Sequence, residues 1–220
     1  MKPKEEMNNY EKWCEQWRIK FLKLDQIALM KRLPELRDEG EWLTLFHFGR
    51  KFGVNRIDGQ IIAMEDKKPV SCYEKLNIYT LFGYASPCAR IIGTWVRFDQ
   101  LKNAAPFSKA FQEGIIMPFG RTFNGYKEQL EQAFCRLQGH KIPQSDVGYE
   151  LNAFGCIPVK FLFWEGDDEF QAQGNLLFDA SATDFIHVES IVTIAAVGLE
   201  NWQMKLVSHW IEVHFLCFKE

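Results

Sequence analysis

The stretch from Val159 to Ile191 constrains the fold of this chain more than any other. Val159 to Trp164 is an almost unbroken apolar run, which predicts a strand covered on both faces. An acidic turn interrupts the run, and a second short strand is expected over Asn175 to Phe178. From Val188 onwards the apolar residues have helical spacing. The stretch therefore predicts a hairpin with a long loop, followed by a helix.

Carboxylates gather around this hairpin and form the first candidate site. Hard divalent cations take several oxygen ligands, and carboxylates at strand ends supply them. The candidates come from the turn, from the end of the second strand and from the first turn of the helix: Glu165, Asp167, Asp168, Glu169, Asp179 and Glu189. Their spacing is not that of an EF-hand loop. The competing interpretation is a solvated acidic turn that keeps an apolar hairpin from pairing with other chains. This interpretation is favoured because runs of charged residues usually lie at the surface.

The first third of the chain predicts two helices and then a small sheet. An amphipathic helix is expected over Tyr10 to Leu24, with its aromatic stripe assigned to core packing, and Asp25 is expected to cap a short second helix. Three strands follow: Leu43–Phe48, Lys51–Arg56 and Gln60–Met64. Asp58-Gly59 favours a two-residue hairpin turn, and Gly49-Arg50 is the weaker turn.

Capping and breaking residues place the later helices. A capping box at Ser71 opens a helix that is expected to end at Gly83. Pro106 begins a short helix that Gly114 is expected to end, and Pro118-Phe119-Gly120 predicts another break. Because hairpins and helices follow one another without regular βαβ alternation, the sequence predicts an α+β fold. We expect a single domain over residues 1–220, with a mainly antiparallel sheet and packed helices.

Composition limits the partners of the chain. Its 220 residues are 47% hydrophobic and 15% aromatic, which predicts a large core. Part of the aromatic load is assigned to a pocket for a flat ligand, with three candidates: Trp95, Phe98 and Trp164. The net charge is -3 with both signs interspersed, which disfavours nucleic acid and a membrane surface as partners. No signal peptide or membrane-spanning run is apparent, so a cytoplasmic protein is expected.

Cysteines and histidines supply weaker signals. No CxxC pair occurs, and an intracellular setting argues against disulfides. Three cysteines on apolar helix faces are expected to be small buried side chains: Cys14, Cys72 and Cys135. Cys88 is expected to be the most exposed thiol, without a histidine partner that the sequence identifies. Three histidines are candidate axial ligands of a tetrapyrrole, although His47 fits a structural role better: His47, His140 and His187.

Three segments together resemble a known family. They are Gly93–Phe98 with Leu101, then Phe111–Pro118, then Phe161–Phe170 with Leu177–Ser181. In order and spacing they resemble an uncharacterised bacterial and archaeal family, domain of unknown function 3786, over about Asp25 to Leu199. One departure is Val188-Glu189, where the family pattern has a hydroxyl cap before the acid. The resemblance implies a prokaryotic, cytoplasmic, anaerobe-linked protein associated with iron–sulfur or corrinoid proteins, and it implies no reaction.

Three functions stay open on the sequence alone. The first, narrowly favoured, is a non-catalytic binder of a small flat organic ligand or cofactor, for example a tetrapyrrole. The second is a hydrolase or lyase in which the acidic turn and Asp179 hold a divalent metal ion that polarises substrate or activates water. The third is an interaction module or homo-oligomer that uses the apolar tail, Leu206–Glu220. The chain has no phosphate-binding glycine motif and no GxSxG elbow, which disfavours nucleotide-dependent and α/β-hydrolase chemistry.

Overall fold

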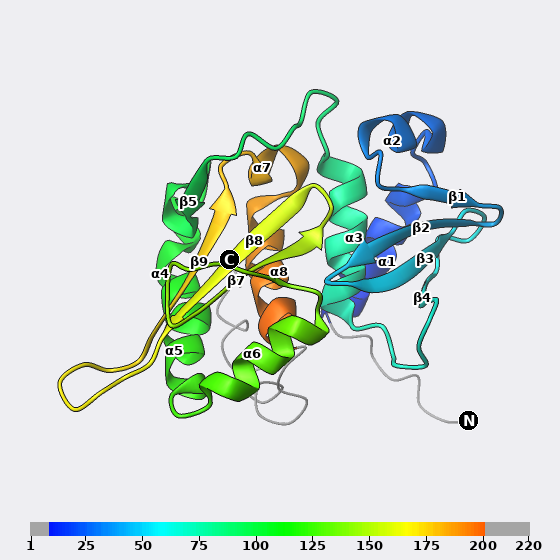
Figure 1. Cartoon of the computed structure of the whole chain (residues 1–220). Helices are drawn as coiled ribbons and strands as arrows, with labels where there is room; N and C mark the ends of the chain where they lie inside the picture. Colours follow the sequence, from blue (N-terminus) through cyan, green and yellow to red (C-terminus); the bar gives the residue numbers. More distant parts are fainter. Residues whose placement is uncertain (1–8, 201–220) are drawn as a thin grey trace, which may run out of the picture.

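Two antiparallel sheets, each packed with helices, organise residues 9–200, which the computed structural model describes (Figure 1). The first sheet has the order β1-β2-β3-β4, with strands Arg37–Glu39, Trp42–His47, Arg50–Asn55 and Ile61–Ala63. The second has the order β5-β9-β8-β7-β6, with strands Trp95–Arg97, Gln173–Asp179, Ile157–Trp164, Val147–Phe154 and His140–Lys141. This is the α+β fold that the sequence predicted.

The helices lie before, between and after these strands. They are α1 (Asn9–Phe21), α2 (Gln26–Arg32), α3 (Cys72–Tyr84), α4 (Ser108–Phe111), α5 (Met117–Phe123), α6 (Lys127–Arg136), α7 (Ala182–Phe185) and α8 (Val188–Glu200). None of the helices within residues 9–200 has the length and apolar character needed to span a bilayer.

Predicted helix caps are confirmed by their hydrogen bonds. The Asp25 side chain accepts from the backbone N–H groups of Ile27 at 2.9 Å and Ala28 at 3.0 Å, which starts α2. Ser71 and Glu74 bond to each other's backbone N–H groups and start α3. Both caps use neighbours within three residues, which is why the sequence alone reveals them.

Glycine positions decide the turns of the first sheet. The tight turn between β2 and β3 consists of Phe48 and Gly49, with φ angles of 47° and 73°. Two consecutive positive φ angles match the twist of a two-residue hairpin. The predicted two-residue turn at Asp58-Gly59 is in the right place but has the wrong length. Because Asn55 N–H donates to the Gln60 carbonyl at 2.8 Å, residues 56–59 form that loop.

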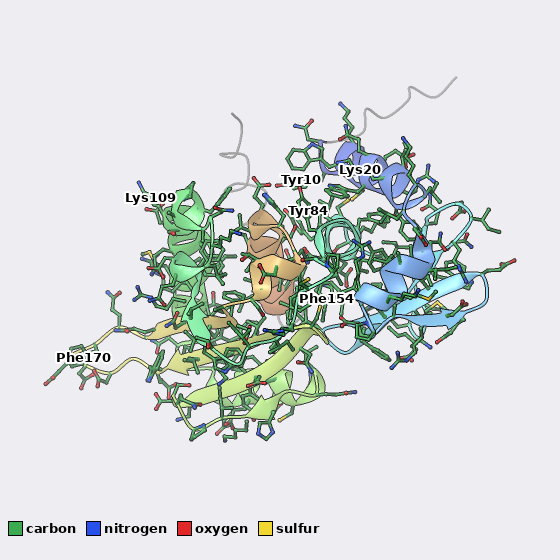
Figure 2. The ribbon with its side chains drawn as sticks, turned by 90° about the horizontal axis from the view of Figure 1, so that it is seen from above. Tyr10, Lys20, Tyr84, Lys109, Phe154 and Phe170 are labelled. Atoms are coloured by element: carbon green, nitrogen blue, oxygen red, sulfur yellow. The ribbon has the colours of Figure 1, made fainter. Side chains whose placement is uncertain are left out.

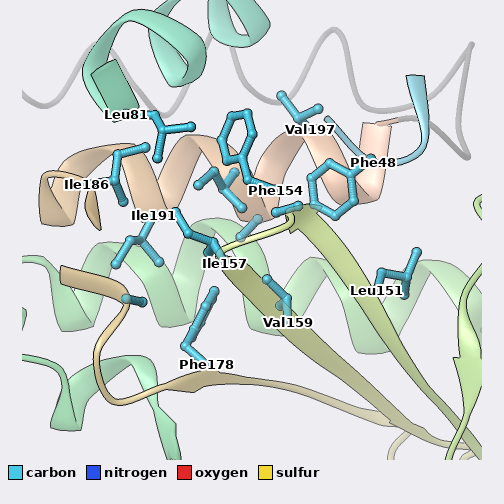
Figure 3. Close-up of a cluster of buried hydrophobic side chains, with 14 of the residues drawn as sticks. Phe48, Leu81, Leu151, Phe154, Ile157, Val159, Phe178, Ile186, Ile191 and Val197 are labelled. Carbon is cyan, nitrogen blue, oxygen red and sulfur yellow. The ribbon is translucent and has the colours of Figure 1, made fainter. Parts of the chain in front are cut away.

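The predicted central hairpin lies in the middle of the second sheet. Phe161 of β8 is opposite Tyr149 of β7 on one side and Leu176 of β9 on the other. Its ring centroid lies 5.5 Å from that of Phe134 in α6 and 6.4 Å from that of Phe119 in α5. Figure 3 shows the buried apolar side chains between this sheet and α8. Most side chains of β8 are buried on both faces, as the apolar run predicted.

Residues 105–123 form one helical run, so the predicted breaks at Gly114 and at Pro118-Phe119-Gly120 are wrong. A 3-10 turn over Ala105–Phe107 leads into α4, then a π-helical turn over Gln112–Ile116, then α5. In the π-helical turn Met117 N–H donates to the Gln112 carbonyl, five residues earlier. This wider turn accommodates Pro118, which has no N–H to donate. Gly120 serves packing, since a Cβ there would lie 2.8 Å from the Ala172 carbonyl oxygen.

Gly83 also has a packing role instead of the predicted terminating one. Helix α3 continues through it to Tyr84. A Cβ on Gly83 would lie 2.5 Å from the Trp17 ring, so the missing side chain lets α1 pack closely on α3.

A buried chain of polar side chains links the two sheets through α3 and α8. His47, at the end of β2, places Nδ1 2.6 Å from the Ala153 carbonyl oxygen of β7. Its Nε2 lies 3.2 Å from the amide nitrogen of Asn77 in α3. The Asn77 side-chain oxygen Oδ1 accepts from the Thr193 hydroxyl in α8. Because buried polar groups are costly unless paired, this chain fixes how the two halves meet.

Candidate functional site

The acidic turn lies in the loop of residues 165–172 between β8 and β9. The Asp167 carboxylate accepts from the backbone N–H groups of Phe170 at 2.7 Å and Glu169 at 2.9 Å. These bonds, that of Phe170 first, lower the pKa of Asp167. Glu165 pairs with Lys127 of α6 at 3.4 Å, and the other carboxylates of the turn are exposed. The carboxylates therefore shape their own loop or face solvent.

Asp179 is a buried anchor at the opposite end of β9. Its carboxylate accepts from the N–H groups of Gly93 at 2.6 Å and Ile92 at 3.2 Å, and from the N–H and hydroxyl of Ser181. Burial disfavours its charged form, but these hydrogen bonds together outweigh burial and lower the pKa of Asp179. At about 3.3 Å per residue, β9 carries Asp179 about 20 Å from the acidic turn. The prediction that both hold one metal ion is therefore wrong in geometry.

The remaining acidic candidate, Glu189, lies on a different element, the first turn of α8. Nowhere in residues 9–200 do three or more His, Cys, Asp or Glu side chains gather closely enough to hold a metal ion. The six predicted carboxylates thus fall into three separate places: the acidic turn, the buried anchor and the α8 terminus.

The three aromatic candidates do not form a pocket. Phe98 is buried in the core, where its ring stacks on that of Phe111 at 4.1 Å. Trp95 is half-buried, and the Lys160 ammonium lies 4.0 Å from its ring centroid. Trp164 is half-buried at the far end of β8, beside the acidic turn. The predicted pocket is therefore wrong. Trp95 and Trp164 lie beside opposite ends of β9, and the Phe98 side chain is buried in the core.

Of the three candidate histidine ligands, His47 has both ring nitrogens engaged. Its Nδ1 faces a carbonyl oxygen and must donate, so Nε2 is the acceptor for the Asn77 amide. Burial lowers the pKa of His47 to about 4, and its ring stacks on Phe154 at 4.3 Å. His47 is a neutral structural histidine, the role that the sequence favoured. His140 is exposed on the short edge strand β6.

His187 lies at a surface formed by α1, α3 and the start of α8. Its ring centroid is 5.1 Å from that of Tyr84, which is 5.5 Å from that of Trp17. The Lys20 ammonium covers the Trp17 ring at 4.0 Å. We name this region the aromatic surface, and it comprises five residues: Tyr10, Trp13, Trp17, Tyr84 and His187.

The aromatic surface is open to solvent. Trp13 is 50% exposed and Tyr84 47% exposed, although rings of this size dominate cores. Figure 2 shows Tyr10 and Tyr84 in one part of the molecule, and Phe170 far from them at the tip of the β8–β9 hairpin. His187 Nδ1 lies 3.5 Å from the Glu189 carboxylate, so two predicted candidates meet beside these rings.

Sequence reasoning missed this surface because it assigned the whole stripe of α1 to the core. That assignment is right for Cys14 and Phe21, which are buried, and wrong for Trp13. The available signal was the excess of rings: Tyr10, Trp13 and Trp17 recur at helical spacing in addition to the two residues that the core buries.

The cysteine predictions are confirmed only in part. Cys14 is buried as expected, whereas Cys72 is half-buried and Cys135 is exposed. Cys135 lies on α6 with its sulfur 3.5 Å from the Tyr149 hydroxyl. Cys88 is exposed, as predicted.

Comparison with known proteins identifies a family but no function. Residues 27–200 match the model of a family described as a domain of unknown function (DUF3786). Neither the curated proteins nor the solved structures contain a match. The apolar tail, Leu206–Glu220, lies outside both the matched and the described residues.

Proposed function

The chain belongs to the DUF3786 family, and we propose that it is a non-catalytic binding protein for a flat organic ligand that stacks on the aromatic surface. A tetrapyrrole is the ligand class that we propose first, in a cytoplasmic setting. The alternative of a metal-dependent hydrolase or lyase required Asp179 to approach the acidic turn, and β9 separates them. The alternative of an interaction module depends on Leu206–Glu220 and stays a prediction.

The observation that carries the proposal is the consecutive contact of Trp17, Tyr84 and His187 at a solvent-exposed surface. Exposed rings offer large apolar faces that lose little conformational entropy when a planar ligand covers them. The ligand would replace water over the half-exposed Tyr84 ring.

His187 adds a coordinating group to these rings. Glu189 holds this ring in place, since its backbone N–H donates to His187 Nδ1 at 3.4 Å and its carboxylate lies 3.5 Å from the same nitrogen. His187 would then be the residue that holds the metal of a bound tetrapyrrole, and Tyr84 would contact the macrocycle. His47 is unsuited to this role because its nitrogens bond to the Ala153 carbonyl oxygen and the Asn77 amide.

The test is titration of the full chain with haemin and with cobinamide, followed by tryptophan fluorescence and ligand absorption. Tyr84→Ala should weaken binding about 10-fold, since loss of a ring contact costs about 0.5–1.5 kcal/mol beyond area burial. His187→Ala should change the absorption band of the bound metal. Trp95→Ala is the matched control, because it removes a half-buried tryptophan from a different face. The proposal fails if neither probe binds, or if Tyr84→Ala and Trp95→Ala have the same affinity.

A further inference from the structure

Two cysteines meet where α1 packs on α3. Cys14 is buried in α1, and its thiol donates to the Cys72 carbonyl oxygen at 3.5 Å. The side chain of Cys72 is also close enough to the Cys14 thiol to raise the pKa of that thiol. Because Cys72 is half-buried, a small solute can reach this pair from solvent. The pair joins positions 58 residues apart in the sequence.

The two sulfurs have different surroundings. Burial, and next the neighbouring Cys72, raise the pKa of Cys14 to about 12, so Cys14 remains a thiol at neutral pH. Cys72 is the first residue of a 13-residue helix, directly after the Ser71 cap. Cys72 is the more exposed of the two residues, and exposure admits an oxidant. Cys72 is therefore the thiol that an oxidant from solvent would reach first. Cys14 is the thiol that would then attack the oxidised Cys72 sulfur.

We propose that Cys14 and Cys72 are a redox modification site that forms a reversible disulfide between α1 and α3 when a peroxide is present. The Cys72 thiolate attacks one oxygen of hydrogen peroxide, the O–O bond breaks, and sulfenic acid and hydroxide form. Cys14 sulfur then attacks the Cys72 sulfur, the S–S bond forms, and the S–O bond breaks. The protons from the two thiols convert the departing hydroxides into water. Two thiols are oxidised by two electrons in total, and one peroxide is reduced to two waters.

The other described cysteines lack this arrangement. The Cys135 sulfur faces the Tyr149 hydroxyl at 3.5 Å. Cys156 interacts with the Glu35 side chain, and burial strongly raises the pKa of its thiol. Cys88 lies in an exposed loop. These residues are internal controls for selectivity, and the proposal is independent of the ligand proposed for the aromatic surface.

Peptide mapping tests the disulfide directly. The full chain is treated with a small excess of hydrogen peroxide, blocked with N-ethylmaleimide and digested with trypsin. Cleavage places Cys14 in residues 13–18 and Cys72 in residues 68–75, each as the single cysteine of its peptide. We expect one cross-linked species that joins these two peptides, lacks two hydrogens and disappears with dithiothreitol.

Variants separate the site from general oxidation. Cys14→Ser and Cys72→Ser should each abolish the cross-link, and Cys14→Ser should leave Cys72 as a sulfenic or sulfinic acid. Cys88→Ser should leave the cross-link unchanged. Full alkylation of Cys14 after peroxide treatment of the wild type would overturn the proposal. So would sulfinic acid at Cys72 without a cross-link, or pairing of Cys72 with any other cysteine.

Discussion

Replacement of His47 by phenylalanine should remove a large part of the acid sensitivity of this fold. Burial lowers the pKa of His47 from 6.5 to about 4. A histidine whose pKa is lower in the folded state contributes stability that is complete above pH 6.5 and is lost as the pH falls through 4. The difference between these pKa values corresponds to about 3 kcal/mol, at about 1.4 kcal/mol for each pH unit.

The variant His47→Phe keeps an aromatic ring against Phe154 but breaks the bonds to Ala153 and Asn77. We expect it to be about 1–3 kcal/mol less stable than the wild type at pH 7, because the buried Asn77 amide loses its His47 partner, while the Ala153 carbonyl oxygen keeps its bond from the Phe48 N–H. Between pH 7 and pH 4 this difference in unfolding free energy should shrink by about 3 kcal/mol and can reverse sign. The reason is that only the wild type has a histidine that is protonated in the unfolded state and held neutral by burial in the folded state.

The measurement is urea unfolding followed by tryptophan fluorescence at several pH values, with the wild type and the variant in parallel. The quantity of interest is the difference between the two unfolding free energies, because other titrating groups cancel in it. His140→Phe is the matched control, since it removes an exposed histidine, and it should stay within about 0.5 kcal/mol of the wild type. A difference between His47→Phe and wild type that is constant from pH 7 to pH 4 would refute the argument.

Three further predictions concern single groups. Asp179→Asn should lower the unfolding free energy by about 2–4 kcal/mol at pH 7, because an amide cannot accept from all four donors, and the loss should shrink below pH 3.8 in urea titrations. Burial and then the charge of Glu74 raise the pKa of Glu200 to about 7, so wild-type stability contributed by this group falls as pH rises from 4.5 through 7. Glu200→Gln should therefore raise the thermal midpoint at pH 8 more than at pH 4, and the reverse order would contradict this. Gly83→Ala should lower the unfolding free energy by about 1–3 kcal/mol, because the added Cβ would lie 2.5 Å from the Trp17 ring. Gly114→Ala is the control and should be neutral or slightly stabilising, because nothing lies within 4 Å of its added Cβ. Equal thermal midpoints for the two variants would contradict the packing role of Gly83.

The two proposals assign the α1–α3 contact a central place. Helix α1 contributes three residues of the aromatic surface and one cysteine of the redox pair. The close approach at Gly83 brings both features against α3. A disulfide at Cys14 would hold α1 in this position. Ligand affinity measured before and after oxidation would therefore show how the disulfide changes binding at the aromatic surface.

Short-range rules let the sequence alone determine much of this architecture. The strand of Val159–Trp164 and its hairpin partner follow from apolar runs bounded by turn residues, and the structure has both. The caps at Asp25 and Ser71 depend on hydrogen bonds within three residues. Both partners of such a bond lie close together in the sequence, so the start of each helix is predictable.

The tertiary structure decided what depends on residues far apart in the chain. Asp179 is a metal candidate in sequence, but amides 86 and 87 residues earlier make it a structural anchor. Gly114 and Pro118 have the composition of helix breaks, but a π-helical turn and contact with β9 keep the helix continuous. Trp17 meets Tyr84, and Tyr84 meets His187, only because α1, α3 and the start of α8 converge. Composition revealed the surplus of aromatic rings, while the burial of some and the exposure of others depended on which surfaces the packed helices left uncovered.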